Sequence, residues 1–107
     1  MNLSEQKCVA CEGGVVPFDK QESETLLKQI PGWELSDDEK SIFRKYTFKN
    51  FKEALAFVNK IGEIAESEGH HPDIHLTDYK HVEIRLSTYA IGGLSNNDFI
   101  LAAKIDK

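Results

Sequence analysis

The chain has 107 residues, of which 40% are hydrophobic and 29% charged, so it is long enough for one modest core and too apolar to be intrinsically disordered. Thirteen Lys and Arg against eighteen Asp and Glu leave a net charge of −5, which argues against direct nucleic-acid binding. No apolar run approaches the roughly 20 residues of a membrane span, and the N-terminus lacks the apolar core of a secretory signal. We therefore expect one cytoplasmic domain over residues 1–107, with its two cysteines reduced.

The N-terminal part of the chain predicts an arm, a short helix and a hairpin. Residues 1–18 show no hydrophobic period and predict an irregular arm. Asp19 and Glu22 have the spacing of a capping box, and a proline–glycine pair stops the helix that follows them. Residues 33–35 and 42–48 are rich in aromatic and β-branched side chains and predict two antiparallel strands.

The strongest helical pattern of the chain follows Asn50. Asn50 and Glu53 form another cap signature, and Gly69 offers the left-handed conformation that commonly ends helices. The pattern therefore predicts the longest helix, ending near Glu68. Its residues at helical spacing are Phe51, Ala54, Leu55, Val58, Ile61, Gly62 and Ala65.

The C-terminal part predicts a second hairpin and a last helix. Residues 74–76 and 82–88 alternate between apolar and polar side chains, and Ser95 with Asp98 has capping-box spacing before an apolar helix. The order helix, two strands, helix, two strands, helix predicts an α+β fold, in which a four-stranded antiparallel sheet carries three helices on one face. Because such a sheet leaves edges and a face uncovered, we expect a homo-oligomer.

A cluster of histidines is the main candidate for chemistry, since all four lie at positions 70, 71, 75 and 81. His70 and His71 follow the long helix, and an antiparallel hairpin brings them toward the end of the last strand, so we expect His71 beside Tyr89. Imidazoles titrate near neutral pH and suit general acid and base catalysis. Glu66, one helical turn before His70, is placed to accept a ring N–H and fix its tautomer.

Two simpler interpretations stay open for these residues. His70 and His71 can be a polar helix end whose imidazoles interact with the helix dipole. Asp98 can be a capping acid in the first turn of the last helix, with a role in a pocket as the alternative.

Metal binding is not expected from the same residues. Pro72 prevents His71 and His75 from sharing a helical face. Cys8 and Cys11 supply only two of the four ligands of a structural zinc site, so a packed or solvated turn is the simpler interpretation.

The chain resembles the pterin-4a-carbinolamine dehydratase family from its C-x-x-C segment to its C-terminal Lys-Ile-Asp. The motifs that carry the resemblance are Glu66, His70-His71-Pro72, Leu86-Ser87-Thr88, Gly92-Gly93-Leu94-Ser95 and Asp98-Phe99-Ile100-Leu101-Ala102-Ala103. The family fold has the element order expected above.

The resemblance implies a dehydration without cofactor or metal, in which 4a-hydroxytetrahydropterin loses water to give quinonoid dihydropterin. This is the 4a-hydroxytetrahydrobiopterin dehydratase (hydro-lyase) step that recycles the cofactor of aromatic amino acid hydroxylases. By resemblance His70 transfers a proton, His71 orients the pterin, and Glu66 and Asp98 support them. The implied substrate-binding residues are His70, His71, Pro72, Thr88, Tyr89, Ala90 and Ile91, and the implied assembly is a homodimer or homotetramer.

The chain departs from the family at one position of the site. The family has Thr-His before the glycine turn, where this chain has Thr88-Tyr89. A phenol donates a hydrogen bond but is a poor base near pH 7, so the departure predicts reduced activity. It also keeps a second function open, that of a catalytically weak or silent relative that acts as a binding, assembly or coactivator protein.

Overall fold

The computed structural model describes residues 2–8 and 16–107 as an α+β fold. Its helices are α1 (Lys20–Leu27), α2 (Phe51–Glu68) and α3 (Asn96–Ile105), with 3₁₀ turns η1 (Leu3–Glu5) and η2 (Tyr89–Ile91). Its strands are β1 (Glu34–Leu35), β2 (Ile42–Thr47), β3 (Asp73–Thr77) and β4 (His81–Leu86). They form one antiparallel sheet in the order β1-β2-β4-β3, so the predicted fold class and element order are confirmed. Among these helices, none has the length and apolar character needed to cross a bilayer.

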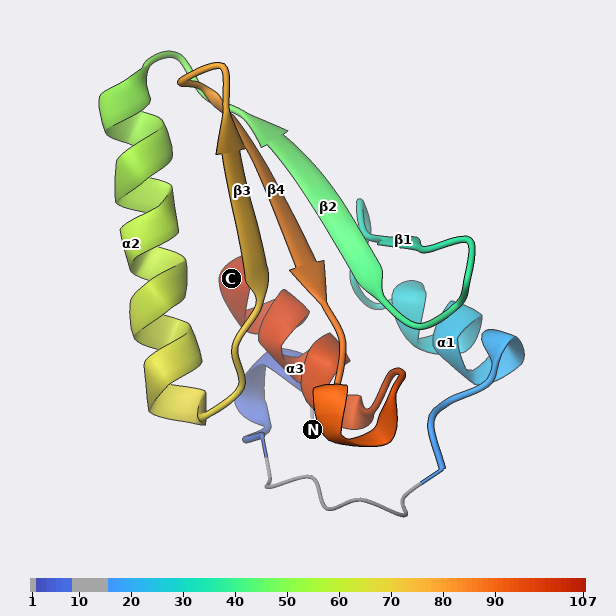
Figure 1. Cartoon of the computed structure of the whole chain (residues 1–107). Coiled ribbons are helices and arrows are strands. Elements are labelled where there is room, and N and C mark those ends of the chain that lie inside the picture. The colour runs from blue at the N-terminus through green and yellow to red at the C-terminus, as the bar shows by residue number, and fades with distance from the viewer. Residues whose placement is uncertain (1, 9–15) are drawn as a thin grey trace.

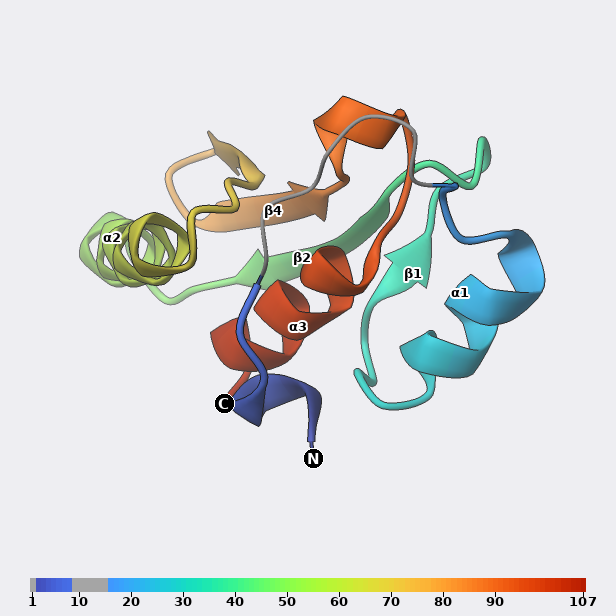
Figure 2. The same ribbon diagram turned by 90° about the horizontal axis from the view of Figure 1, so that it is seen from below.

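The helices cover one face of the sheet. α3 lies across the middle of the sheet, α2 runs along its β3 side, and α1 lies at the β1 edge (Figures 1 and 2). β4 alternates between buried and partly exposed residues, as its sequence predicts. Its buried residues join a core with these members of α2, α3 and β2: Ile42, Ala54, Ile61, Phe99, Ile100, Leu101 and Ile105.

The predicted signals set the bounds of the longest helix. Asn50 Oδ1 accepts a hydrogen bond from the Glu53 backbone N–H at 2.9 Å, which caps the first turn of α2. Gly69 ends the helix with a φ of +66°. The buried side of α2 is narrower than its apolar pattern suggests, because Phe51 and Leu55 are 50% and 42% exposed.

The hairpin between β3 and β4 orients the segment that follows α2. Asp78 and Tyr79 both have positive φ, at 48° and 56°, which is the backbone of a tight turn between twisted strands. The ladder closes with the pair Asp73 and Arg85 at its other end. His70 and His71 therefore lie between the C-terminus of α2 and the start of β3, just outside the ladder.

Part of the N-terminal arm is packed against the domain. Leu3 is buried in the core, and Lys104 of α3 donates to the Ser4 carbonyl at 3.0 Å. The second cysteine, Cys11, lies outside the described residues.

Candidate functional site

His70 and Asp98 form the centre of the candidate site. His70 Nε2 lies 2.6 Å from Asp98 Oδ1, although 28 residues separate them along the chain. The Asp98 side chain is fully buried in the first turn of α3, and that of His70 is only 12% exposed. Because a carboxylate only accepts hydrogen bonds, the neutral His70 ring carries its proton on Nε2 and keeps the lone pair on Nδ1.

Two further residues hold the other oxygen of the Asp98 carboxylate. Thr88 Oγ1 donates to Asp98 Oδ2 at 2.7 Å, and the backbone N–H of Ser95 donates to the same oxygen at 3.0 Å. Asp98 is therefore a capping acid and a partner of His70 at the same time, so the two interpretations of this residue do not exclude each other. The carboxylate receives three donors, two of them on the oxygen that faces away from His70.

The position of Thr88 in this hydrogen-bond network is held by the loop between Thr88 and Gly93. Thr88 and Gly93 form an isolated antiparallel bridge, in which the Thr88 N–H donates to the Gly93 carbonyl at 2.7 Å. Gly92 has a φ of +65°, and a Cβ on Gly93 would lie 2.7 Å from Pro17 Cβ. Gly92 is therefore required by the backbone of the turn, and Gly93 by its close approach to Pro17.

His71 and Glu66 form a second pair at the surface. His71 Nε2 lies 2.6 Å from Glu66 Oε1, with both side chains well exposed. The prediction that Glu66 accepts from His70 is wrong, because the left-handed turn at Gly69 takes His70 off the face of α2 that Glu66 occupies. Asp98 takes the place that the helical spacing assigned to Glu66.

The remaining residues predicted for the site differ in their exposure to solvent. The β3–β4 ladder stops at Asp73, so it does not extend to place His71 opposite Tyr89. Tyr89 begins η2, and the residue is 97% exposed. Ala90 is exposed, whereas Pro72 and Ile91 are partly buried.

Cys8 lies close to the same end of the molecule. Its backbone N–H donates to Glu68 Oε1 at 2.9 Å, and its thiol donates to the Asn97 carbonyl at 3.6 Å. Burial, and next the negative charge of Glu68, raise the pKa of Cys8 to about 12, so the thiol is protonated at neutral pH. Within the described part of the chain, no three His, Cys, Asp or Glu side chains come together as a metal site.

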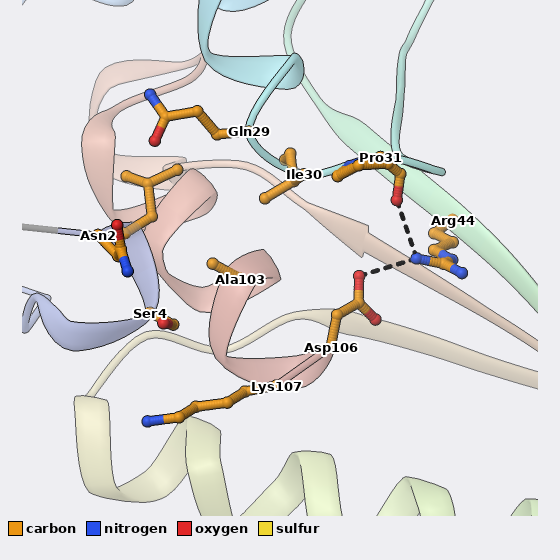
Figure 3. A pocket seen from close by; sticks show the side chains of 10 residues that line it. Asn2, Ser4, Gln29, Ile30, Pro31, Arg44, Ala103, Asp106 and Lys107 are labelled. Carbon is orange, nitrogen blue, oxygen red and sulfur yellow. Dashed lines mark hydrogen bonds and ion pairs between the residues drawn. The ribbon is translucent and has the colours of Figure 1, made fainter.

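A hollow of about 540 Å³ lies in another part of the fold, between η1, the segment after α1 and the end of α3. Figure 3 shows Arg44 at its rim, bonded to the Pro31 carbonyl and to Asp106. Its polar rim is occupied by these internal hydrogen bonds, and it holds none of the residues predicted for catalysis.

Comparison with known proteins agrees with the fold and the motifs. The family model described as pterin 4 alpha carbinolamine dehydratase matches residues 16–107. A relative from Halorhodospira halophila, provisionally named pterin-4-alpha-carbinolamine dehydratase, is 51% identical over 106 residues, which are 99% of this chain and 96% of the relative. A relative from Rubrobacter xylanophilus with the same provisional name is 48% identical over 105 residues, which are 98% of this chain and 96% of the relative.

Two solved structures share the fold. One is a transcriptional coactivator/pterin dehydratase from Brucella melitensis, with a TM-score of 0.78 and 28% identity, covering 84% of this chain and 95% of that one. The other is a pterin dehydratase-like protein identified as a RuBisCO assembly factor in the alpha-carboxysome. Its TM-score is 0.60 at 22% identity, covering 70% of this chain and 86% of that one, which shows the fold alone. With the family match over residues 16–107 and these identities, the chain belongs to the pterin-4-alpha-carbinolamine dehydratase family.

Proposed function

We propose that the protein catalyses the dehydration of 4a-hydroxytetrahydropterin to quinonoid dihydropterin by general acid and base catalysis. The observation that carries the proposal is the 2.6 Å contact between His70 and the fully buried Asp98. An imidazole held by a carboxylate in a defined tautomer is the usual arrangement of a proton-transfer residue. Family membership supplies the substrate class.

The reaction needs one base and one acid. A base removes the proton from N5, the bond between C4a and the hydroxyl oxygen breaks, and a C4a–N5 double bond forms. The departing hydroxyl takes a proton from an acid and leaves as water. No electrons are gained or lost overall, so general acid and base groups are sufficient for this step.

His70 fits the role of the base. Since its Nε2–H is directed at Asp98, its Nδ1 lone pair is the one left for the substrate. Proton uptake by Nδ1 makes an imidazolium, which the buried Asp98 carboxylate stabilises at 2.6 Å. The pair therefore favours the state that forms as N5 loses its proton.

His71 and the loop after β4 complete the proposed site. Glu66 accepts from His71 Nε2 and sets the orientation of that ring for contact with the pterin. Tyr89, which starts the exposed turn after Thr88, acts as the acid or hydrogen-bond donor to the leaving hydroxyl. Pro72 and residues 90–91 line the remaining pterin-binding surface in this proposal. The proposal also assigns the protein to the cytoplasm.

The test is the rate of 4a-hydroxytetrahydropterin dehydration above the uncatalysed background. The wild-type chain is expected to accelerate the reaction, and His70→Ala is expected to remove most of the gain, about 10²-fold or more. His75→Ala is the matched control, because His75 is exposed on β3, on the polar face of the sheet. Equal losses in both variants, or no acceleration by the wild type, would exclude the proposed role of His70.

A second function is favoured by exposed aromatic and apolar side chains. Tyr89 is almost fully exposed, and Phe51 and Leu55 are large apolar residues on the open side of α2. Exposed apolar side chains of this kind are typical of interaction sites, and the Brucella melitensis protein is described as both a coactivator and a dehydratase. If the wild-type rate equals background while the chain is folded, this second function becomes the better proposal.

A further inference from the structure

A chain of hydrogen bonds continues behind the His70–Asp98 pair. Thr88 Oγ1 lies 2.7 Å from Asp98 Oδ2 and 2.6 Å from Ser95 Oγ. Thr88 has one hydroxyl proton, which it donates to the carboxylate, so the Ser95 hydroxyl must be the donor to Thr88. The order is therefore Ser95 to Thr88 to Asp98, with His70 donating to the other carboxylate oxygen.

The position of Thr88 differs from the role that the family resemblance implies. The resemblance places Thr88 among the substrate-binding residues, but its side chain is buried and turned toward Asp98. Tyr89, the next residue, is almost fully exposed to solvent. The Thr88 hydroxyl therefore contacts the carboxylate and not the surface where a pterin would lie.

The backbone around Thr88 leaves its hydroxyl little freedom. The bridge to Gly93 holds the Thr88 N–H, and the Thr88 carbonyl accepts from the Ile91 N–H at 3.2 Å. A β-branched side chain on extended backbone also has few χ1 rotamers. The direction of the hydroxyl is therefore fixed before any ligand binds.

We propose that Thr88 is a positioning residue of the His70 site. Its hydroxyl, which accepts a hydrogen bond from the Ser95 hydroxyl, holds Asp98 Oδ2 so that Oδ1 faces the His70 ring and keeps the ring in the Nε2–H tautomer. Without this donor, Asp98 Oδ2 keeps only the hydrogen bond from the Ser95 N–H, and the buried carboxylate turns toward other donors, which releases the His70 ring. The kinetic part of this inference rests on the proposed dehydratase function, whereas the tautomer does not.

The first test is the ring tautomer of His70, measured from ¹⁵N and ¹H NMR signals of the histidine side chains. In the wild-type chain His70 is expected as the Nε2–H tautomer, whose proton exchanges slowly with water. Thr88→Val keeps the shape of the side chain but removes the hydroxyl, and is expected to shift the His70 signals toward a mixture of tautomers. Thr88→Ser keeps the hydroxyl and is expected to retain the wild-type pattern.

Thr47→Val is a matched control on the open face of the sheet. Thr47 Oγ1 lies 3.0 Å from His81 Nδ1, so this variant removes a hydroxyl from a different histidine. It is expected to move the signals of His81 and leave those of His70 unchanged. Unchanged His70 signals in folded Thr88→Val would overturn the proposal.

The second test separates positioning from substrate binding. Thr88→Val is expected to lower kcat about 10-fold with KM unchanged, as is typical when a residue that orients a catalytic group is lost. A raised KM with unchanged kcat would instead assign Thr88 to the substrate surface and overturn the proposal.

Two outcomes keep this inference distinct from the proposed function. If Thr88→Val does not fold, the NMR signals of the wild-type chain still test the proposal. A His70 ring in the Nδ1–H tautomer overturns it without any variant. If the wild-type chain shows no dehydration, the proposed function fails, while the tautomer and its response to Thr88→Val still support or overturn the positioning role.

Discussion

Tyr89 is the residue at which, by the resemblance of the sequence, we expect this chain to depart from the catalytic pattern of its family. The phenol follows the buried Thr88 and is 97% exposed. A neutral phenol donates a proton only weakly near pH 7, whereas an imidazole at the same position can donate or accept one. In the proposed dehydratase, we therefore expect Tyr89 to limit the acid or base function of the loop, while the His70–Asp98 pair is intact.

Tyr89→His is expected to raise kcat/KM for dehydration by about 10²-fold, the usual contribution of one positioned acid or base. The measurement is the dehydration rate above background. Tyr79→His, in the exposed turn between β3 and β4, controls for the added imidazole and is expected to have no effect. A loss of activity in Tyr89→His would show that the phenol has a specific role. A wild-type rate at background that Tyr89→His restores would favour the binding or assembly function.

Cys8 shows how burial controls reactivity at a single side chain. Because its pKa is raised to about 12 from 9.0, the folded chain keeps the thiol proton over a pH range in which the unfolded chain loses it. Cys8 therefore stabilises the fold below pH 9.0, and this stabilisation is lost as the pH rises toward 12.

We expect iodoacetamide to modify Cys8 slowly at pH 8. In a Cys11→Ser variant Cys8 is the remaining thiol of the chain, so the rate of modification reports on it alone. Native protein is expected to react at least about 10-fold more slowly than the same variant in guanidinium chloride, because thiolate is the reactive form. Equal rates in the two conditions would show that Cys8 is neither shielded nor raised in pKa.

At the scale of elements, one glycine within α2 and one that caps its C-terminus have opposite structural requirements. Gly62 lies within the helix, and a Cβ there would have no heavy atom within 4 Å. Gly69 ends the helix with positive φ and starts the turn that leads to His70. The first glycine therefore only weakens the helix, whereas the second determines the direction of the chain.

Gly62→Ala is expected to raise the free energy of unfolding by about 0.5 to 1 kcal/mol, since alanine loses less conformational entropy in a helix. Gly69→Ala is expected to lower it by about 1 kcal/mol, because alanine is strained in the left-handed conformation. Urea unfolding followed by circular dichroism measures both. The same sign for the two substitutions would contradict this assignment.

At the scale of the whole molecule, Asp106 connects the C-terminus to the first hairpin. Its carboxylate accepts from Trp33 Nε1 at 2.7 Å, Arg44 Nη1 at 2.9 Å and the Tyr46 hydroxyl at 2.6 Å (Figure 3 shows the Arg44 contact). Burial, together with the hydrogen bond to Asp106 and its charge, raises the pKa of Tyr46. One carboxylate thus joins α3, β2 and the segment before β1.

Asp106→Ala is expected to lower the free energy of unfolding by about 2 to 3 kcal/mol, because it leaves three donors without their charged acceptor. Asp37→Ala, at an exposed position in the first hairpin, is the control and is expected to change stability little. Urea unfolding by circular dichroism measures both variants. A similar loss in the two would show that the Asp106 contacts contribute little.

The exposed apolar side chains of α2 bear on how whole molecules associate. Phe51 and Leu55 are exposed on one helix, and in the sheet of the described residues β3 beside it is an edge strand, paired with β4 alone. We expect a homodimer or homotetramer in solution, measured by light scattering after size exclusion. Leu55→Lys is expected to lower the mass, whereas Thr25→Lys on α1 adds the same charge and is expected to leave it unchanged. A wild-type monomer would contradict this expectation.

The sequence by itself determined the type and order of the helices and strands and the two ends of α2, whereas α1 ends at Leu27, before the proline–glycine pair. Cap signatures at Asn50 and Ser95, the glycine at position 69 and the alternation along β4 act within a few residues, so their effects can be derived from spacing alone. The same local signals supported the α+β order. The family motifs alone are enough to predict His70 and Asp98 as site residues.

Only the tertiary structure decided how the site residues pair. Helical spacing assigned Glu66 to His70, but the chain turns at Gly69 and His70 meets Asp98, 28 residues away. Nothing in the local pattern around Thr88 shows that its hydroxyl turns inward to this carboxylate. Hydrogen bonds between distant segments depend on how the sheet and α3 pack together, and a short-range pattern contains no information about that packing.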